Sequence, residues 1–157
     1  AAGHNIFLIR WPVAQAARGD LATPEWWTEA AGGWRQQAQL TELPTPVFTN
    51  GQTEFTVHFA PTLNRFVEVQ GNGFGAVDLA WRQAEQPTGP WSPVQPFFKP
   101  AEAARAGVFL YAVKAHPQLQ GADVVLTYVV NHSDFGQLVS DTSIYYPRFL
   151  QGRWPQN

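Results

Sequence analysis

The sequence predicts an all-β fold built from short antiparallel strands, and three observations support this prediction. Runs of alternating apolar and polar residues are separated by turn signals rich in Gly, Pro and Asn. Aromatic and charged residues each make up 14% of the 157 residues, which favours a packed globule over a disordered chain. The run TVHFAPTL at residues 56–63 returns as AVKAHPQL at residues 112–119. A repeat of about 56 residues is typical of strand arrays such as propeller blades.

The first fifty residues are predicted to contain few regular elements. Residues 5–11 (NIFLIRW) are predicted to be a strand, whereas residues 13–17 are too few for a helix to be assigned. Trp26, Trp27 and Trp34 are interpreted as an aromatic cluster on a loop. Residues 40–52 contain two prolines and the dipeptide Asn50-Gly51, which predicts a turn.

The next segment is predicted to form one antiparallel sheet of four strands. The strands are expected at residues 53–59, 65–70, 75–82 and 91–98, with a turn between each pair. A sheet of this size corresponds to one propeller blade. After a connector at residues 100–106, strands are expected to resume at 108–114, 124–130 and 144–149. No domain boundary is evident, so residues 1–157 are interpreted as one segment.

Composition excludes several functional classes. The formal net charge is −2 and the basic residues are scattered, so the chain lacks the basic stripe that nucleic acid requires and a polybasic membrane anchor. No stretch approaches the roughly 18 consecutive apolar residues of a membrane span. Because the chain has no Cys, disulfides and thiolate metal sites are excluded.

The start of the sequence bears on the expected location of the protein. The chain begins Ala-Ala-Gly-His and contains no Met. Such a start is expected after removal of a signal peptide, or where a longer protein is divided. We therefore expect a secreted or extracellular protein, and the incomplete repeat favours division of a longer one.

Four runs resemble a known family. AEQPTGPWS at residues 84–92 resembles a turn of five-bladed β-propeller glycosidases and their relatives. YAVKAHP at 111–117, LTYVVN at 126–131 and YYPRF at 145–149 resemble the last blade of a secreted subgroup, formerly described as a domain of unknown function. Some members of that subgroup resemble endo-acting, arabinan-degrading glycoside hydrolases. The similarity covers residues 5–150 and matches only the C-terminal part of such a domain.

The resemblance implies a partial five-bladed β-propeller, with about two and a half blades over residues 1–157. A second chain or an N-terminal segment would complete the propeller, and a carbohydrate would be the ligand. The implied function is that of a glycoside hydrolase acting on a polysaccharide such as arabinan. Hydrolysis needs two carboxyl groups, and the resemblance places at least one on the absent blades, so catalytic residues stay unassigned. The alternative is a non-catalytic sugar-binding or structural segment.

The repeat and the resemblance together suggest where sugar would bind. His58 and Lys114 occupy equivalent positions in the repeat, and His116 shares a strand face with Lys114. If inner strands converge on a channel, these side chains are expected to meet there, with Asn131 or Tyr145 within reach. For His58 and His116 the alternative is a hydrogen-bonded histidine near a turn.

Two further residues complete the candidate set. Glu68 alternates with apolar neighbours in a predicted strand and could face a polar funnel, and Trp26 could stack on a sugar ring. A solvated carboxylate and a structural Trp are the alternatives. We expect no metal site, because the four His are far apart in the sequence. No cofactor is expected either, since the glycine-rich residues 71–75 have no helix after them to hold phosphate.

Overall fold

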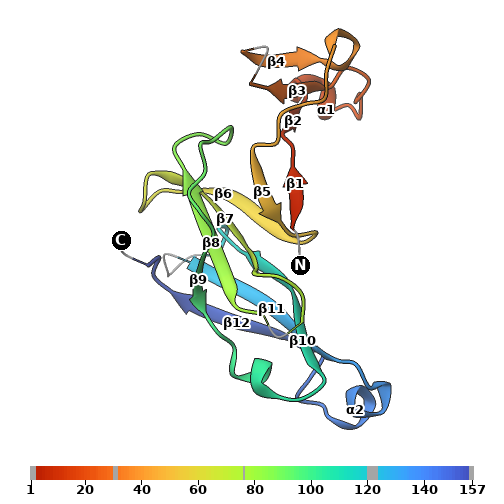
Figure 1. Ribbon diagram of the computed structural model, residues 1–157, viewed down its shortest axis with the longest axis vertical. Helices are drawn as coiled ribbons and strands as arrows, with labels where there is room; N and C mark the ends of the chain where they lie inside the picture. The colour runs from red at the N-terminus through yellow and green to blue at the C-terminus, as the bar shows by residue number, and fades with distance from the viewer. Residues whose placement is uncertain (1–2, 30–31, 76, 120–123, 156–157) are drawn as a thin grey trace.

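The computed structural model describes residues 3–29, 32–75, 77–119 and 124–155. Within these residues the chain is mostly β, with antiparallel sheets of two to four strands. Figure 1 shows a small sheet at one end, a sheet with helix α2 (Phe135–Ser140) at the other, and the four-stranded sheet between them. The prediction of a β fold with antiparallel sheets is confirmed, and the described residues also form two short α-helices, α1 (Val13–Ala16) and α2. Among the described residues, no helix is long and apolar enough to cross a membrane.

The N-terminal strand is divided between two sheets. β1 (His4–Ile6) pairs with β5 (Phe48–Gly51), whereas β2 (Ile9–Arg10) pairs with β3 (Glu25–Thr28). The prediction of one continuous strand over residues 5–11 is therefore wrong, because the chain changes pairing partner between Ile6 and Ile9. Short helix α1 (Val13–Ala16) follows β2.

The aromatic cluster is a hairpin, so its assignment to a loop is wrong. β3 pairs with β4 (Gly33–Gln36), and Trp27 lies directly opposite Trp34 with their ring centroids 5.8 Å apart. Cross-strand aromatic pairs stabilise such a ladder, which the loop assignment overlooked. A 3-10 turn, η1 (Gln37–Gln39), ends the hairpin. The predicted turn at Asn50-Gly51 is also wrong: both residues belong to β5, and Asn50 adopts a φ of 57° that Asn tolerates.

The predicted four-stranded sheet is confirmed. β6 (Phe55–Ala60), β7 (Arg65–Gly71), β8 (Leu79–Ala84) and β9 (Gln95–Phe98) pair in sequence order. β8 and β9 both begin four residues later than predicted, at Leu79 and Gln95. Before β8 the chain crosses to β10, where Gly75 bridges Leu110. One face of this sheet carries Val67, Val69 and Trp81 into the core.

The C-terminal sheet has three strands in the order β10-β11-β12. β10 (Val108–Ala115) follows the 3-10 turn η2 (Ala101–Ala104) and pairs with β11 (Val124–His132), which pairs with β12 (Pro147–Gly152). The last strand starts three residues later than the predicted 144–149. Ile144 instead lies in the preceding turn, where its side chain is buried.

A β-bulge in β10 changes which residues face the core. The register shifts between Tyr111 and Lys114, and Ala112 has a φ of 53°. Strict alternation would place Leu110 and Val113 on opposite faces, yet both are buried. The bulge therefore keeps the apolar residues on both sides of it in the core.

The same bulge explains how the two copies of the sequence repeat differ. Both copies end in the same turn bond, from the Leu63 N–H to the Ala60 carbonyl and from the Leu119 N–H to the His116 carbonyl. However, Val57 is 42% exposed, whereas its repeat equivalent Val113 is 1% exposed. The copies share a turn but not the direction in which equivalent side chains face.

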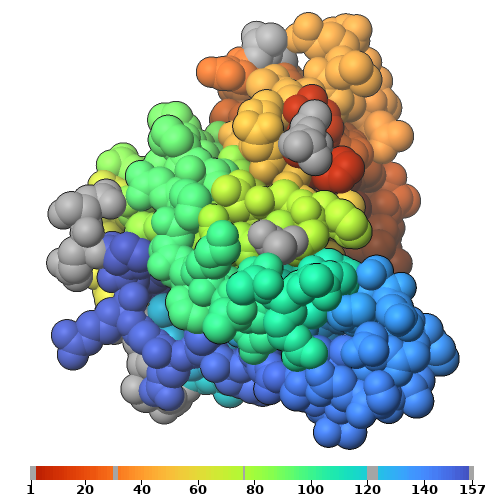
Figure 2. Space-filling model, turned by 60° about the horizontal axis from the view of Figure 1, so that its bottom comes forward, coloured from red at the N-terminus to blue at the C-terminus, as the bar shows by residue number. Residues whose placement is uncertain are grey.

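The core lies between the four-stranded and three-stranded sheets. Trp154, which follows β12, is buried and stacks on Trp81 of β8 with ring centroids 5.4 Å apart. The same ring lies 5.8 Å from His58. Figure 2 shows the dark blue C-terminal residues next to the green residues of the central sheet. The C-terminal segment thus ties the two sheets together.

Candidate functional site

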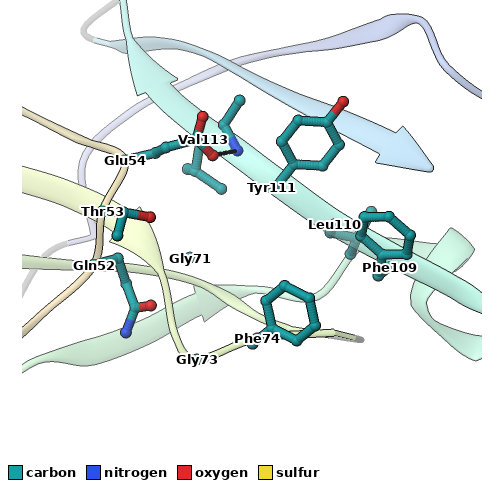
Figure 3. A pocket seen from close by; sticks show the side chains of 11 residues that line it. Gln52, Thr53, Glu54, Gly71, Gly73, Phe74, Phe109, Leu110, Tyr111 and Val113 are labelled. Carbon is teal, nitrogen blue, oxygen red and sulfur yellow. Dashed lines mark hydrogen bonds between the residues drawn. The ribbon is translucent and has the colours of Figure 1, made fainter. Parts of the chain in front are cut away.

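A cleft of about 260 Å³ opens between the segment that leads into β6 and the edge of β10 (Figure 3). Gln52, Thr53 and Glu54 form one side, and three aromatic residues form the other. The buried residues Leu110 and Val113 also line the cleft. The cleft therefore combines polar groups and aromatic rings on opposite walls.

The aromatic wall is a platform of three rings. Phe74 and Phe109 have ring centroids 6.0 Å apart with planes 22° from parallel, and Phe109 and Tyr111 have centroids 5.9 Å apart with planes 31° from parallel. Figure 3 shows the three rings side by side with their faces turned the same way. Phe74 is 85% exposed. We call Phe74, Phe109 and Tyr111 the aromatic platform.

Local sequence explains how the aromatic platform is built. Phe109 and Tyr111 are two residues apart in β10 and so share the face opposite the buried Leu110. Phe74 lies between Gly73 and Gly75, whose φ values of 112° and 97° favour glycine. The Leu110 N–H donates to the Gly75 carbonyl at 2.9 Å, and this bond fixes the loop that carries Phe74 beside β10.

Glu54 holds the other wall in place. Its Oε2 accepts a hydrogen bond from the Ala112 N–H at 2.7 Å, inside the β-bulge. Thr56, two residues after Glu54, acts in the same way: its Oγ1 accepts a hydrogen bond from the Ala115 N–H at 3.0 Å. These side chains satisfy N–H groups on the edge of β10, which would otherwise lack strand partners. Glu54 is thus both a cleft carboxylate and the group that caps the bulge beside Tyr111.

Comparison with known proteins assigns the chain to a family. The family described as Domain of unknown function (DUF5005) matches residues 2–153. The chain belongs to this family. No curated protein matches the chain. The family description names no activity.

Two of the three basic residues predicted to bind sugar, Lys114 and His116, have hydrogen-bond partners within the DUF5005 domain. Lys114 Nζ donates to the Phe55 carbonyl at 3.1 Å, which ties β10 to β6. A hydrogen bond of 2.8 Å joins His116 Nε2 to Thr127 Oγ1. His58 is half-buried beside Trp154, and burial lowers its pKa. None of the three lines the cleft of Figure 3.

Asn131 lies in β11, and Tyr145 lies beside that strand in the segment that precedes β12. The Tyr145 N–H donates to the carbonyl of Val130 at 2.8 Å, and the Tyr145 side chain is 58% exposed. Asn131 pairs with Phe109, so the two side chains share a face of the sheet. Asn131 is thus the predicted binding residue that lies beside the aromatic platform. Its Oδ1 accepts from the His132 N–H at 2.7 Å.

Glu68 is a buried ion-pair partner. Its Oε2 accepts from Arg82 Nε at 2.9 Å, and the two side chains are 0% and 4% exposed. Burial raises the pKa of Glu68 to about 7, and the charge and hydrogen bond of Arg82 act in the opposite direction. Arg82 also donates to the carbonyls of Thr49 and Asn50, so the pair connects β8 to β5. In the DUF5005 domain this carboxyl supports the packing of two sheets.

Trp26 lies in β3, in the N-terminal part of the chain, whereas the other residues predicted to bind sugar all come after β5 in the sequence. It lines an apolar pocket of about 320 Å³ together with Phe7, Leu40 and Leu43. Among the described residues, its indole N–H finds no hydrogen-bond partner. The described residues hold no group of three or more His, Cys, Asp or Glu that could bind a metal ion.

Sequence reasoning missed the aromatic platform. The signal was present, because Phe109 and Tyr111 alternate with Val108 and Leu110 in a predicted strand, and one face of that strand had to point outward. The third ring, Phe74, belongs to the glycine-rich residues 71–75, whose sequence lacks the helix of a phosphate site and indicates no other ligand. Its position beside Phe109 depends on a long-range bridge that the sequence does not reveal.

Proposed function

We propose that this chain is a sugar-binding part of a carbohydrate-active protein, with the aromatic platform as its contact surface. The observation that carries the proposal is the set of three rings turned the same way beside Glu54 (Figure 3). Sugars present apolar C–H faces that stack on aromatic rings and hydroxyl groups that hydrogen-bond to carboxylates and amides. Glu54 and Gln52 supply such acceptors across the cleft.

Binding is a better supported role for this cleft than bond cleavage. Glycoside hydrolysis uses two carboxyl groups, about 5–9.5 Å apart. Among the described residues that line the cleft, Glu54 is the only carboxylate, and one of its oxygens already accepts the Ala112 N–H. A hydrolase of the arabinan-degrading type, which the sequence resembles, would need a second carboxyl from another segment or chain. We therefore propose hydrolysis only for a larger assembly that contains this chain.

Loss of one ring should weaken sugar binding without unfolding the chain. Phe74→Ala removes an exposed ring, so stability should change by no more than about 0.5 kcal/mol. We expect the affinity for a bound oligosaccharide to fall about fivefold, because an aromatic contact contributes about 1 kcal/mol. Isothermal titration calorimetry against a panel of gluco-, xylo-, manno- and arabino-oligosaccharides measures this change.

The matched control for this experiment is Phe135→Ala. Phe135 is 75% exposed on α2 and does not line the cleft. Its removal should leave the affinity unchanged. Equal effects of the two substitutions, or unchanged binding in Phe74→Ala, would contradict the assignment of the aromatic platform as the sugar-binding surface.

We also propose that the two larger sheets are neighbouring blades of a secreted β-propeller, completed by another segment or chain. Support comes from the sequential pairing of β6 to β9 and from the packing of this sheet against β10 to β12. Near the last strand, Tyr145, Tyr146 and Phe149 are 58%, 58% and 68% exposed. A following blade would cover these side chains.

Exposed rings near β12 should make the isolated chain self-associate. We expect native mass spectrometry to detect species above the 17.5 kDa monomer. Phe149→Ser should reduce their fraction, because association of the variant removes less apolar surface from water. Leu43→Ser, which changes a residue that is 88% exposed in the N-terminal part, serves as the control. A chain that stays monomeric at every concentration contradicts the proposed missing blade.

A further inference from the structure

We propose that the cleft selects neutral sugar chains of at least two consecutive units, and that Glu54 excludes chains of uronic acids. This inference rests on the proposed sugar-binding function and names the class of ligand. Two features of the cleft carry it: the extent of the aromatic platform and the charge of its lining.

The extent of the platform points to a chain rather than a single sugar. Successive ring centroids are 6.0 Å and 5.9 Å apart, and the rings lie side by side (Figure 3). One sugar ring can stack on one aromatic face, so a monosaccharide leaves the remaining rings uncovered. A chain of consecutive sugars covers more of this apolar surface and gains more from its removal from water.

The charge of the lining points to neutral sugars. Among the described residues that line the cleft there is one carboxylate, Glu54, and no Lys or Arg. The nearby Lys114 directs its ammonium group to the Phe55 carbonyl. A uronate carboxylate in this cleft would therefore face a like charge without a compensating cation. Like charges a few ångströms apart repel, and the repulsion grows as water leaves the cleft.

Glu54 is poorly placed to avoid this repulsion. Its Oε2 holds the Ala112 N–H at 2.7 Å, and that N–H belongs to the bulge next to Tyr111. If the carboxylate swung away, it would leave an edge N–H without its partner. The charge is thus fixed beside the aromatic platform, where it discriminates between sugars that differ only in charge.

The test compares ligands that differ only in charge or length. Cellohexaose, the same hexamer with each hydroxymethyl group oxidised to a carboxylate, and glucose are titrated into the chain at low salt. Equivalent neutral and oxidised pairs with other backbones are included. We expect the neutral hexamer to bind at least tenfold more tightly than its oxidised form and at least tenfold more tightly than the monosaccharide. Because surface electrostatics are screened, the first ratio should shrink as salt is raised.

Glu54→Gln keeps an acceptor for the Ala112 N–H and removes the charge, so the ratio of neutral to oxidised affinity should fall toward one. A ratio that persists in this variant, or that does not change with salt in the unaltered chain, overturns the role of Glu54. Equal or tighter binding of oxidised hexamers overturns the preference for neutral sugars but leaves sugar binding intact. Equal binding of glucose overturns the requirement for a chain. If no neutral hexamer binds, the proposed function itself fails.

Discussion

Arg82→Met lowers the free energy of unfolding by about 3–5 kcal/mol at pH 8, because it leaves Glu68 buried without its partner. In the folded chain Glu68 and Arg82 are 0% and 4% exposed and are joined at 2.9 Å. The substitution also removes two hydrogen bonds to the carbonyls of Thr49 and Asn50, which connect the central sheet to β5. Urea unfolding, with the free energy extrapolated to water, measures the loss.

The pH dependence of Arg82→Met separates the effect of charge from that of the lost hydrogen bonds. Burial raises the pKa of Glu68 from 4.5 to about 7 in the folded state, so the folded chain holds this proton more tightly than the unfolded chain. The stabilising effect of that proton is fully present below about pH 4.5 and is lost as the pH rises through about 7. Without Arg82 the pKa of Glu68 rises further. The variant should therefore recover part of its stability at pH 5.

Two further variants identify the source of the loss. Adding Glu68→Gln to Arg82→Met removes the buried charge and should restore part of the stability at pH 8. Arg65→Met breaks the exposed pair with Glu85, in which the side chains are 38% and 73% exposed, and should cost at most about 1 kcal/mol. A loss that is the same at pH 5 and pH 8 would assign the effect to the hydrogen bonds with β5. A loss under about 1 kcal/mol at pH 8 would show that the pair does not stabilise the fold.

Trp154→Ala should destabilise the chain by about 3–5 kcal/mol, the range found when a buried large aromatic is truncated. Trp154 is 3% exposed and stacks on Trp81, although it lies close to the end of the chain. Its removal would open a cavity between the two larger sheets and lower the urea concentration at the unfolding midpoint. Trp154→Phe keeps a ring in this space and should cost less.

The control for the Trp154 experiment is Phe149→Ala. Phe149 lies on β12 a few residues before Trp154, but it is 68% exposed. Its truncation should change the free energy of unfolding by no more than about 0.5 kcal/mol. Similar losses in the two variants would show that the C-terminal segment acts through general apolar content and does not depend on the contact between Trp154 and Trp81.

The sequence by itself determined the β class and the four-stranded sheet of β6 to β9. Alternating runs separated by Pro61, Asn72-Gly73 and residues 87–90 specify short strands joined by tight turns, and pairing of neighbours needs no long-range information. The repeated run at residues 56–63 and 112–119 also indicated the same local structure twice, and both copies contain the same turn bond. These features are local, so patterns and turn residues are sufficient to predict them.

Tertiary structure decided where the strands pair at long range and which side chains meet. Because of the bulge at Ala112, side chains in the second copy of the repeat point to the opposite face of the sheet from their equivalents in the first copy. His58 and Lys114 therefore have equivalent positions in the sequence but different surroundings. Glu68 is buried because β5 covers its face of the sheet and Arg82 reaches across to it. No local pattern in the sequence indicates the bulge or the packing of β5 over Glu68.

The position of the aromatic platform is set partly by local sequence and partly by tertiary contacts. Alternation in β10 places Phe109 and Tyr111 on one face, and the sequence alone carries that information. Phe74 joins them only because Gly75 bridges Leu110, 35 positions later in the numbering. Glu54 reaches the same site through its bond to Ala112. A site made of three separated segments is set by hydrogen bonds and packing between them, and those contacts exist only once the chain is folded.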